Sequence, residues 1–478
     1  MIGQLRHILS SSTNLHTELL LFLGLLLLVL LQAFLEKSKK SRQIILIAAE
    51  VLVLGTLCCT DDKNTSVSFL FNGLLEINPL ITLAKQLVLV ATLIVFAHIH
   101  VLKYDYRSEA LILIVGISFG LCFLVMANHI LSMFISMEMV SLCSYVLVAF
   151  RKKATNLEAG IKYLIFGATA SAFMLFGGSL LFGMTGTMQF NEMSRLVEQG
   201  SNALGLVQVA LFMTLAGPLF KLAAVPFHLW APDVYESTPT PLISFLAIAP
   251  KIGGLFMIFK LLEIVPKDHS LLLSLLIILS ILVGNFAALS QKQAKRMMGY
   301  SGIAQAGFIL IGMLNSENVG IQASVFYLSV YVFTNTGAFL LIDMLKQLSG
   351  SNKFKSFSGL GQEHILIALL GFVLMVSLTG LPPTGGFMSK FLVFTSLWEK
   401  YSLNSSPILL TVLLFGLVNT AISLYYYFKI PYYMFVKKAN EDVHTGNKPS
   451  VASVFLLVFL CIVVVALFFN PEWVQNRF

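Results

Sequence analysis

The sequence predicts an all-α protein that crosses a membrane many times. Its mean hydropathy is +0.86, and 11% of its residues are charged, whereas soluble domains carry about 25%. Apolar runs of about 20 residues recur from end to end, separated by short polar links. No stretch of about 100 residues is polar enough to form a separate soluble domain. The sequence therefore predicts one membrane domain covering residues 1–478.

Charged or turn-rich links divide the chain into fourteen predicted transmembrane spans. In order, they cover residues 18–35, 43–60, 80–102, 109–127, 129–150, 158–184, 204–235, 240–263, 270–291, 300–314, 320–346, 363–397, 406–434 and 451–470. The seventh and twelfth spans are long and contain proline and glycine clusters, which interrupt a helix. We therefore expect two broken helices, 7 and 12, among the fourteen.

The first three spans fill the N-terminal segment, residues 1–108. The apolar run from Glu18 to Leu35 has the length of a signal-peptide core, but its basic residues follow the run instead of preceding it. No convincing small-residue cleavage site is present. We interpret the run as a retained first helix whose N-terminal end lies on the outer side.

Basic residues are divided unequally between the two sides that this topology defines. Links after odd-numbered spans hold eighteen Lys and Arg residues, and the opposite side holds six. The positive-inside rule places the richer side in the cytoplasm or its topological equivalent, so both termini are expected on the outer side. The same asymmetry accounts for the net charge of +8 without any role for nucleic acid.

Spans four to eight (109–263) and nine to thirteen (270–434) form two blocks of five helices, followed by a C-terminal helix at 451–470. In each block the fourth helix is the broken one and carries a lysine beside the break, Lys221 or Lys390. Because each block has an odd number of helices, the second block enters from the opposite side. The sequence thus predicts an inverted repeat, in which working sites lie at broken helices near the midplane.

Seven lysines fall within the predicted spans, where an amine near the bilayer centre costs about 3 kcal/mol. Three of them, Lys85, Lys260 and Lys429, lie toward span ends, and we interpret these as snorkelling to the interface. Lys162 lies early in its span, so it fits either snorkelling or a functional role.

Lys251 lies near the middle of its span, in IAPKIGG, out of easy reach of both interfaces. It joins Lys221 and Lys390 as a candidate functional lysine, since a lysine at that depth normally faces a polar interior. Glu138 is the matching acid, in the middle of span 129–150. Polar side chains follow it at i+3 and i+7, so one stripe of that helix is polar. The alternative is a neutral carboxylic acid that only forms hydrogen bonds.

The stretch GPLFKLAAVPFHLWAPDVYESTPTP places further polar groups after Lys221. His228 lies on a similar face if the helix resumes after Pro226, and its role as proton relay or structural group is left open. Asp233 and Glu236 occupy the one odd-numbered link without Lys or Arg. The sequence does not decide whether these acids meet a neighbouring subunit or guide protons inward.

A hydrated line through Glu138, Lys221, Lys251 and Lys390 would let protons pass between titratable side chains inside the membrane. The sequence contains no P-loop, dinucleotide fingerprint or metal-ligand spacing. Neither covalent catalysis nor cofactor chemistry is therefore predicted for this chain.

Four segments carry a resemblance to a known family: FKLAAVPFHLWAPDVYESTPTP, ISMEMVSLCSYVLVAF, KYLIFGATASAFMLFGGSLLFGMTGT and GLPPTGGFMSKFLVF. They resemble the antiporter-like subunits N of respiratory complex I, the proton-pumping NADH:quinone oxidoreductase. The likeness covers roughly residues 100–430, and APDVYE followed by PTP is its most specific part. Ser237 and Thr238 depart from the Gly-Ala-like pair of the family.

The resemblance implies that Glu138 and Lys221 form an ion pair, that Lys251 is the central relay, and that Lys390 serves the second broken helix. It also implies that NADH, FMN, iron-sulfur clusters and quinone bind to other subunits, so this chain has no redox site. The implied partners are antiporter-like and small membrane subunits of the complex. The implied location is a bacterial inner membrane, with both termini on the periplasmic side.

Two other hypotheses stay open on the sequence. A stand-alone cation/proton antiporter would use the same lysines on an ion gradient. A scaffold would keep the buried charges only to hold its helices in register.

Overall fold

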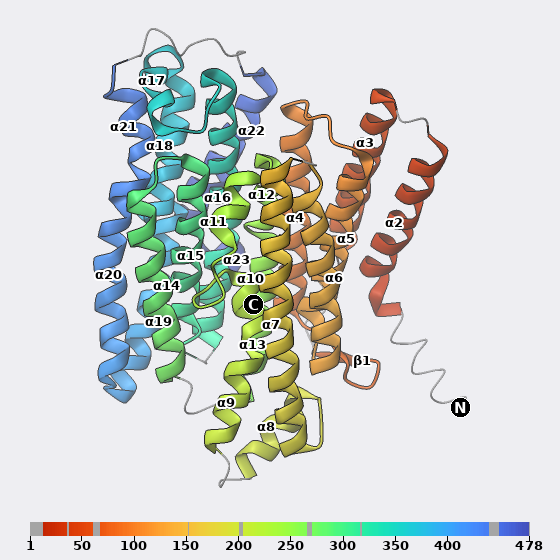
Figure 1. Ribbon diagram of the computed structural model, residues 1–478. Coiled ribbons are helices and arrows are strands. Elements are labelled where there is room, and N and C mark those ends of the chain that lie inside the picture. Colours follow the sequence, from red (N-terminus) through yellow and green to blue (C-terminus); the bar gives the residue numbers. More distant parts are fainter. Residues whose placement is uncertain are drawn as a thin grey trace. The chain divides into compact units, whose positions relative to one another are not determined.

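A computed structural model describes residues 13–35, 38–60, 67–151, 153–199, 204–264, 270–315, 318–438 and 449–477. Helices make up most of it, together with one short antiparallel hairpin formed by β1 (Ser68–Leu70) and β2 (Leu75–Ile77) (Figure 1). In these residues, twelve helices are long and apolar enough to cross a membrane. The predicted all-α polytopic fold is confirmed, and the hairpin is an addition that the sequence did not predict.

The chain forms two compact units. The first unit contains residues 1–221 and 249–269, and the second contains residues 222–248 and 270–476. Residues 222–248, which the sequence assigns to the first block of five helices, thus belong to the second unit. The inverted repeat itself stays a prediction.

The first unit is built around α4, α5 and α6. Its helices are η1 (Thr13–Leu15), α2 (His16–Phe34), α3 (Lys39–Cys58), α4 (Pro79–Val101), α5 (Ser108–Met126), α6 (Ile130–Ala149), α7 (Ala154–Thr185), α8 (Phe190–Gln199), α9 (Leu204–Thr214), α10 (Ala216–Leu222) and α13 (Ala249–Leu262). α6 packs against α5 and α7, and α13 packs against α4 and α5. The candidate residues of this unit lie on α6, α10 and α13.

The second unit surrounds the long helix α16. Its helices are α11 (Ala231–Ser237), α12 (Thr240–Leu246), α14 (Ser270–Ser290), α15 (Ala294–Gly312), α16 (Asn318–Ser349), η3 (Phe354–Phe357), α17 (Leu360–Glu363), α18 (Ile365–Thr379), α19 (Gly385–Asn404), α20 (Pro407–Tyr427), α21 (Lys429–Phe435), α22 (Val451–Phe469) and α23 (Glu472–Gln475). α16 contacts α12, α15, α18, α19 and α22. Of the most apolar stretch of α16, 94% of the residues are buried, so α16 is a core helix of this unit.

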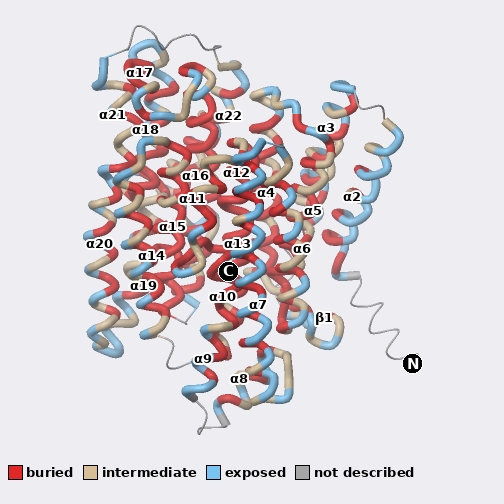
Figure 2. The backbone as a smooth tube through the Cα atoms, viewed as in Figure 1, coloured by how far each residue is buried: buried red, intermediate tan, exposed pale blue. Residues whose placement is uncertain are grey.

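Local capping and a lipid-compatible surface explain why these segments form helices. Ser38 and Asn78 accept the backbone N–H of Ser41 and Ile81 at the starts of α3 and α4, which satisfies donors that a helix leaves unpaired at its N-terminus. Figure 2 shows α2 exposed along much of its length, and its outward residues are leucines such as Leu23. Because lipid tails are as apolar as a protein core, such a face suits a bilayer.

Two predicted spans have different boundaries in the structure. The span predicted at 240–263 is divided, since α12 ends at Leu246 and α13 begins at Ala249. The span predicted at 300–314 begins earlier, at Ala294, so Lys295 and Arg296 lie in the first turn of α15 and not in a link. The prediction was wrong there because two adjacent charged residues lower the local hydropathy, so the sequence assigns them to a polar link. Six of the loop Lys and Arg residues counted above lie outside the described residues: Arg6, Lys37, Lys63, Lys152, Lys267 and Lys448.

Candidate functional site

The first broken helix ends with a left-handed residue. α10 stops at Leu222 because Ala223 has a φ of 56°, a conformation that does not continue a right-handed helix. Regular structure is then interrupted over residues 223–230. The predicted break is confirmed, but Pro218 lies inside α10 and not at the edge of the interruption.

Lys221 lies in the last turn of α10 and is 2% exposed. Its Nζ has no hydrogen-bond partner in the described part of the chain, although Glu138 and Cys143 of α6 lie near enough to interact with it electrostatically. The half-buried Glu138 instead accepts a hydrogen bond from the hydroxyl of Ser171 on α7. Glu138 and Lys221 are thus brought into electrostatic range without a direct hydrogen bond.

Close packing holds α6, α7 and α10 together around this pair. A Cβ on Gly217 would lie 2.5 Å from Sδ of Met174, so a larger residue there would require the Met174 side chain to move. Tyr163 of α7 packs edge-on against Tyr145 of α6, with ring centroids 4.8 Å apart. It also stacks on Phe220, the neighbour of Lys221, at 5.4 Å. This aromatic column fixes the position of α10 relative to the helix that carries Glu138.

Lys251 lies in the first turn of α13, beside a second interruption that the sequence prediction overlooked. Pro250, the residue before it, has no N–H to continue the helix from α12, and proline is favoured in the first turn of a new helix. Lys251 is 1% exposed. Because the N-terminal end of a helix carries positive partial charge, this position opposes a charge on the amine. The proline in IAPKIGG was the signal for the break.

Lys390 of α19 binds the C-terminal end of α18. These two helices are the halves of the second predicted broken helix. α18 ends at Thr379, where Gly380 adopts a φ of 87°, the conformation that glycine supplies at helix C-termini. Nζ of Lys390 donates to the carbonyl of Thr379 at 2.7 Å and lies 4.2 Å from the ring centroid of Phe308. A helix C-terminus and an aromatic face both attract a cation. The carbonyl of Thr379 and the ring of Phe308 are therefore described partners of the Lys390 amine.

A buried polar network reaches the same helix end. Nε2 of Gln305, on α15, donates to the carbonyl of Leu378 at 3.0 Å and to the hydroxyl of Tyr427 at 2.9 Å. Oε1 of Gln305 accepts from the hydroxyl of Tyr327 on α16. Leu378 directly precedes Thr379, so side chains from α15 and α19 bind two consecutive carbonyls of the last turn of α18. Sequence reasoning missed Gln305 because a neutral amide in an apolar span carries no charge signal.

Two lysines expected to snorkel are buried partners in ion pairs. Nζ of Lys85, on α4, lies 2.7 Å from Oε1 of Glu18 on α2, and the two side chains are 6% and 1% exposed. Nζ of Lys260, on α13, lies 2.7 Å from Oε2 of Glu76 in β2 and 3.4 Å from Oε2 of Glu263. The snorkelling prediction is wrong for both, because each amine has a carboxylate partner within the protein. Glu18 and Glu76 are far in sequence from the lysines they pair with, whereas Glu263 is three residues from Lys260.

The two further candidates lie in less enclosed positions. Lys162 of α7 pairs with Glu158 at 2.8 Å, and their side chains are 41% and 67% exposed. Such an exposed pair contributes at most about 1 kcal/mol. His228 is half-buried within the interruption that follows α10.

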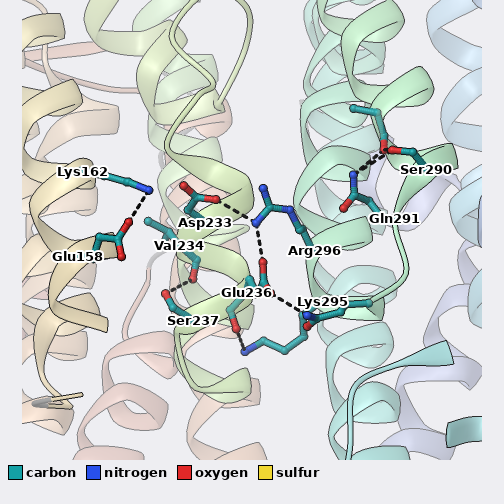
Figure 3. A network of polar contacts seen from close by, with 12 residues as sticks. Glu158, Lys162, Asp233, Val234, Glu236, Ser237, Ser290, Gln291, Lys295 and Arg296 are labelled. Atoms are coloured by element: carbon teal, nitrogen blue, oxygen red, sulfur yellow. Dashed lines mark hydrogen bonds and ion pairs between the residues drawn. The ribbon is translucent and has the colours of Figure 1, made fainter. Parts of the chain in front are cut away.

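The acids of the APDVYE segment meet the start of α15 (Figure 3). Nη1 of Arg296 lies 3.0 Å from Oδ1 of Asp233 and 2.5 Å from Oε2 of Glu236. Gln293 donates to Oε1 of Glu236 at 2.8 Å, and Lys295 donates to its backbone carbonyl at 3.0 Å. Within this chain both acids bind α15 and link α11 to it.

Comparison with known proteins identifies the family. Residues 127–423 match the family model described as NADH:quinone oxidoreductase/Mrp antiporter, TM. The chain belongs to this family. A curated relative, NADH-quinone oxidoreductase subunit N of Paramagnetospirillum magneticum, is 34% identical over 460 residues, which cover 93% of this chain and 91% of the relative. The resemblance to subunit N is thereby confirmed.

Two solved structures share the fold over nearly the whole chain. A chain of respiratory complex I from Thermus thermophilus with bound aureothin superposes with a TM-score of 0.81 at 29% identity, covering 96% of this chain and 98% of that one. A chain of the Mrp complex from Dietzia sp. DQ12-45-1b gives a TM-score of 0.85 at 18% identity, covering 98% and 96%. The second likeness shows the fold alone. This family member is a multi-pass membrane protein.

Among the described residues, no group of three His, Cys, Asp or Glu side chains lies close enough to hold a metal ion. That cofactors bind only to other subunits stays a prediction.

Proposed function

We propose that this chain is a proton-translocating subunit of an NADH:quinone oxidoreductase. The observation that carries the proposal is the position of three buried lysines beside helix interruptions. Lys221 lies in the last turn of α10, Lys251 lies in the first turn of α13, and the amine of Lys390 binds the end of α18. Interrupted helices leave backbone groups that lipid cannot satisfy, so they are tolerated inside a membrane only beside protein or water. Ionisable groups at such places mark proton or ion pathways.

Glu138 and Lys221 form the entry step of this proposal. The charge of Glu138 interacts with the ammonium of Lys221, and no described hydrogen bond fixes that ammonium in place. A proton arriving on Glu138 removes the negative charge that favours the ammonium, so Lys221 then releases its proton more easily. Ser171 donates to Glu138, and this hydrogen bond stabilises the carboxylate. Glu138 therefore returns to its charged form once the proton has moved on.

The other two lysines extend this proposal. Lys251 lies in the first turn of α13, beside the positive end of that helix. Lys390 donates to the carbonyl of Thr379 at the end of α18. Both are buried, and we propose each as a relay position within its own unit.

The energy for transport would come from outside this chain. Its relatives are named as subunits of an NADH-quinone oxidoreductase, and we propose that the flavin, iron-sulfur clusters and quinone bind to other subunits. Conformational and electrostatic changes would then reach this chain through neighbouring membrane subunits. The proposed location is a bacterial inner membrane with both termini on the periplasmic side, as the distribution of basic residues predicts.

A stand-alone cation/proton antiporter is the second candidate, because the matching family model also includes Mrp antiporters. The high-coverage relative at 34% identity, which is a subunit N, favours the redox-driven complex instead. Exchange of sodium for protons by the isolated chain in vesicles would decide for the antiporter.

The test uses the assembled complex in sealed vesicles, with NADH oxidation and proton uptake measured together. Lys221→Ala should abolish most of the proton uptake per NADH, and Glu138→Gln should reduce it in part. Lys346→Ala, at an exposed site on α16, is the control and should pump normally. Normal coupling in Lys221→Ala would contradict the relay and support a scaffold role for the buried charges.

A further inference from the structure

We propose that a pocket in the second unit binds the headgroup of an anionic phospholipid. The pocket has a volume of about 980 Å³ and lies among the α14–α15 link, the segment around η3, and helices α20 and α21. This volume is at the upper end of the range for small-molecule sites. The inference does not depend on the proton relay, because none of the relay residues lines the pocket.

Four lysines line this pocket: Lys292, Lys353, Lys355 and Lys429. No Asp or Glu stands among the lining residues that the structure describes. The first three lysines are exposed, and no ion pair joins them to a carboxylate in the described part of the chain. The pocket therefore concentrates positive charge that the protein itself does not neutralise, which is the chemistry that recognises a phosphate group.

Hydrogen bonds to the backbone carbonyls of the lysines order the segments that carry them. The N–H of Phe354 donates to the carbonyl of Lys292 at 3.2 Å. The hydroxyl of Ser356 donates to the carbonyl of Lys353 at 2.7 Å, and that of Ser358 donates to the carbonyl of Lys355 at 2.9 Å. The three lysines are thus presented from ordered backbone, which reduces the entropy lost when they bind a ligand.

Lys429, the fourth lysine of the lining, is held by the end of α14. Its Nζ donates to the carbonyls of Leu289 and Gln291, at the end of α14. It was expected to snorkel, and in the structure it is partly exposed and bound to this helix end. An ammonium has three N–H donors, so one is left to point toward a ligand. Lys429 also lies 5.8 Å from the ring centroid of Phe354 and 5.6 Å from that of Tyr425.

Beside the lysines and three neutral polar residues at the end of α14 and in its link to α15, the lining is apolar and aromatic, which favours a lipid over free phosphate. Leu424 of α20 and Phe428 at its end supply apolar surface, and Tyr425 and Tyr432 are 66% and 45% exposed. The adjacent α14 ends at Ser290, so the pocket lies where a span ends and headgroups begin. Tyrosines are enriched at that depth. Acyl chains can then lie against the apolar part while the phosphate meets the lysines.

The experiment uses the full-length chain purified in a neutral detergent and native mass spectrometry to count bound lipids. Phosphatidylglycerol and phosphatidylcholine are the probes, with inorganic phosphate as a competitor. The wild-type chain should bind phosphatidylglycerol in preference to phosphatidylcholine. The triple variant Lys292→Gln, Lys353→Gln, Lys355→Gln should bind phosphatidylglycerol about 100-fold more weakly, since each lysine near a membrane surface contributes roughly a factor of five.

A matched triple variant controls for net charge. Lys40→Gln, Lys103→Gln and Lys346→Gln remove the same charge from exposed sites outside the pocket and should leave binding unchanged. A Lys→Arg triple variant at the three pocket sites keeps the charge and should keep binding, which separates a lost site from a misfolded chain.

Four outcomes would overturn the proposal. Equal binding of the two lipids, or equal loss in the control triple variant, would show attraction by net charge alone. Complete displacement of phosphatidylglycerol by an equal concentration of inorganic phosphate would show a soluble-anion site. Cross-linking of Lys355 to an acidic segment of a neighbouring subunit in the assembled complex, with no lipid retained, would show a protein interface.

Discussion

Replacing Lys260 with methionine tests the buried ion pair at the end of α13. The substitution keeps a long apolar side chain and removes only the ammonium. Glu76, which is 5% exposed, would keep Asn78 as a hydrogen-bond donor at 2.8 Å but would lose its counter-charge. Removing one partner of a buried pair costs about 3–5 kcal/mol. Because Asn78 still satisfies part of the carboxylate, we expect a loss of about 3 kcal/mol in the free energy of unfolding.

The assay is denaturant unfolding of the full-length chain in micelles, followed by far-ultraviolet circular dichroism. Glu76→Gln should cost a similar amount, and the double variant Lys260→Met, Glu76→Gln should cost clearly less than the sum of the two. Lys162→Met is the matched control, since its pair with Glu158 is exposed, and it should cost at most about 1 kcal/mol.

The reasoning would be refuted if Lys260→Met cost no more than Lys162→Met. That result would support the earlier prediction that the Lys260 amine lies at the membrane interface. Additive costs in the double variant would likewise show that Lys260 and Glu76 do not interact.

Three further predictions rest on the same measurement of unfolding. Lys85→Met should cost about 3–5 kcal/mol, because Glu18 is almost fully buried beside it, and recovery in Lys85→Met, Glu18→Gln is the check. Gln305→Leu should cost about 1–3 kcal/mol for each buried group left without its partner, and an unchanged stability would argue against the network. Arg296→Gln should cost only about 1 kcal/mol, since its contacts with two acids are partly exposed. A loss several times larger would show that the α11–α15 contact is more enclosed than it is in this structure.

The helices could be predicted from hydropathy because a bilayer requires apolar runs of a nearly fixed length. Both broken helices could be predicted because proline and glycine have direct effects on the backbone. The break before Lys251 was missed for a related reason: a single Pro250 in an apolar run does not lower its hydropathy. The charged pair at the start of α15 was misplaced because the residues that bind Arg296 lie on another helix.

In the candidate site too, some residues could be predicted from the sequence and others could not. Lys221, Lys251 and Lys390 could be selected from sequence because a lysine in an apolar span is costly wherever it points. The partners could not be selected. Glu76 is 184 residues from Lys260, and the hairpin that carries it has no strong sequence signal. The hydrogen bonds of Gln305 depend on three other helices, and no local pattern in α15 indicates them.

The division of the chain into two units has a mechanical consequence. Residues 222–248 belong to the second unit, yet both of their ends continue into the first, at Lys221 and at Ala249. One joint therefore lies directly after Lys221, and the other lies two residues before Lys251. The segment is thus covalently anchored to the first unit beside two of the candidate lysines. Strain carried by the backbone of residues 222–248 would reach the last turn of α10 and the first turn of α13 directly, because one joint adjoins Lys221 and the other lies two residues from Lys251.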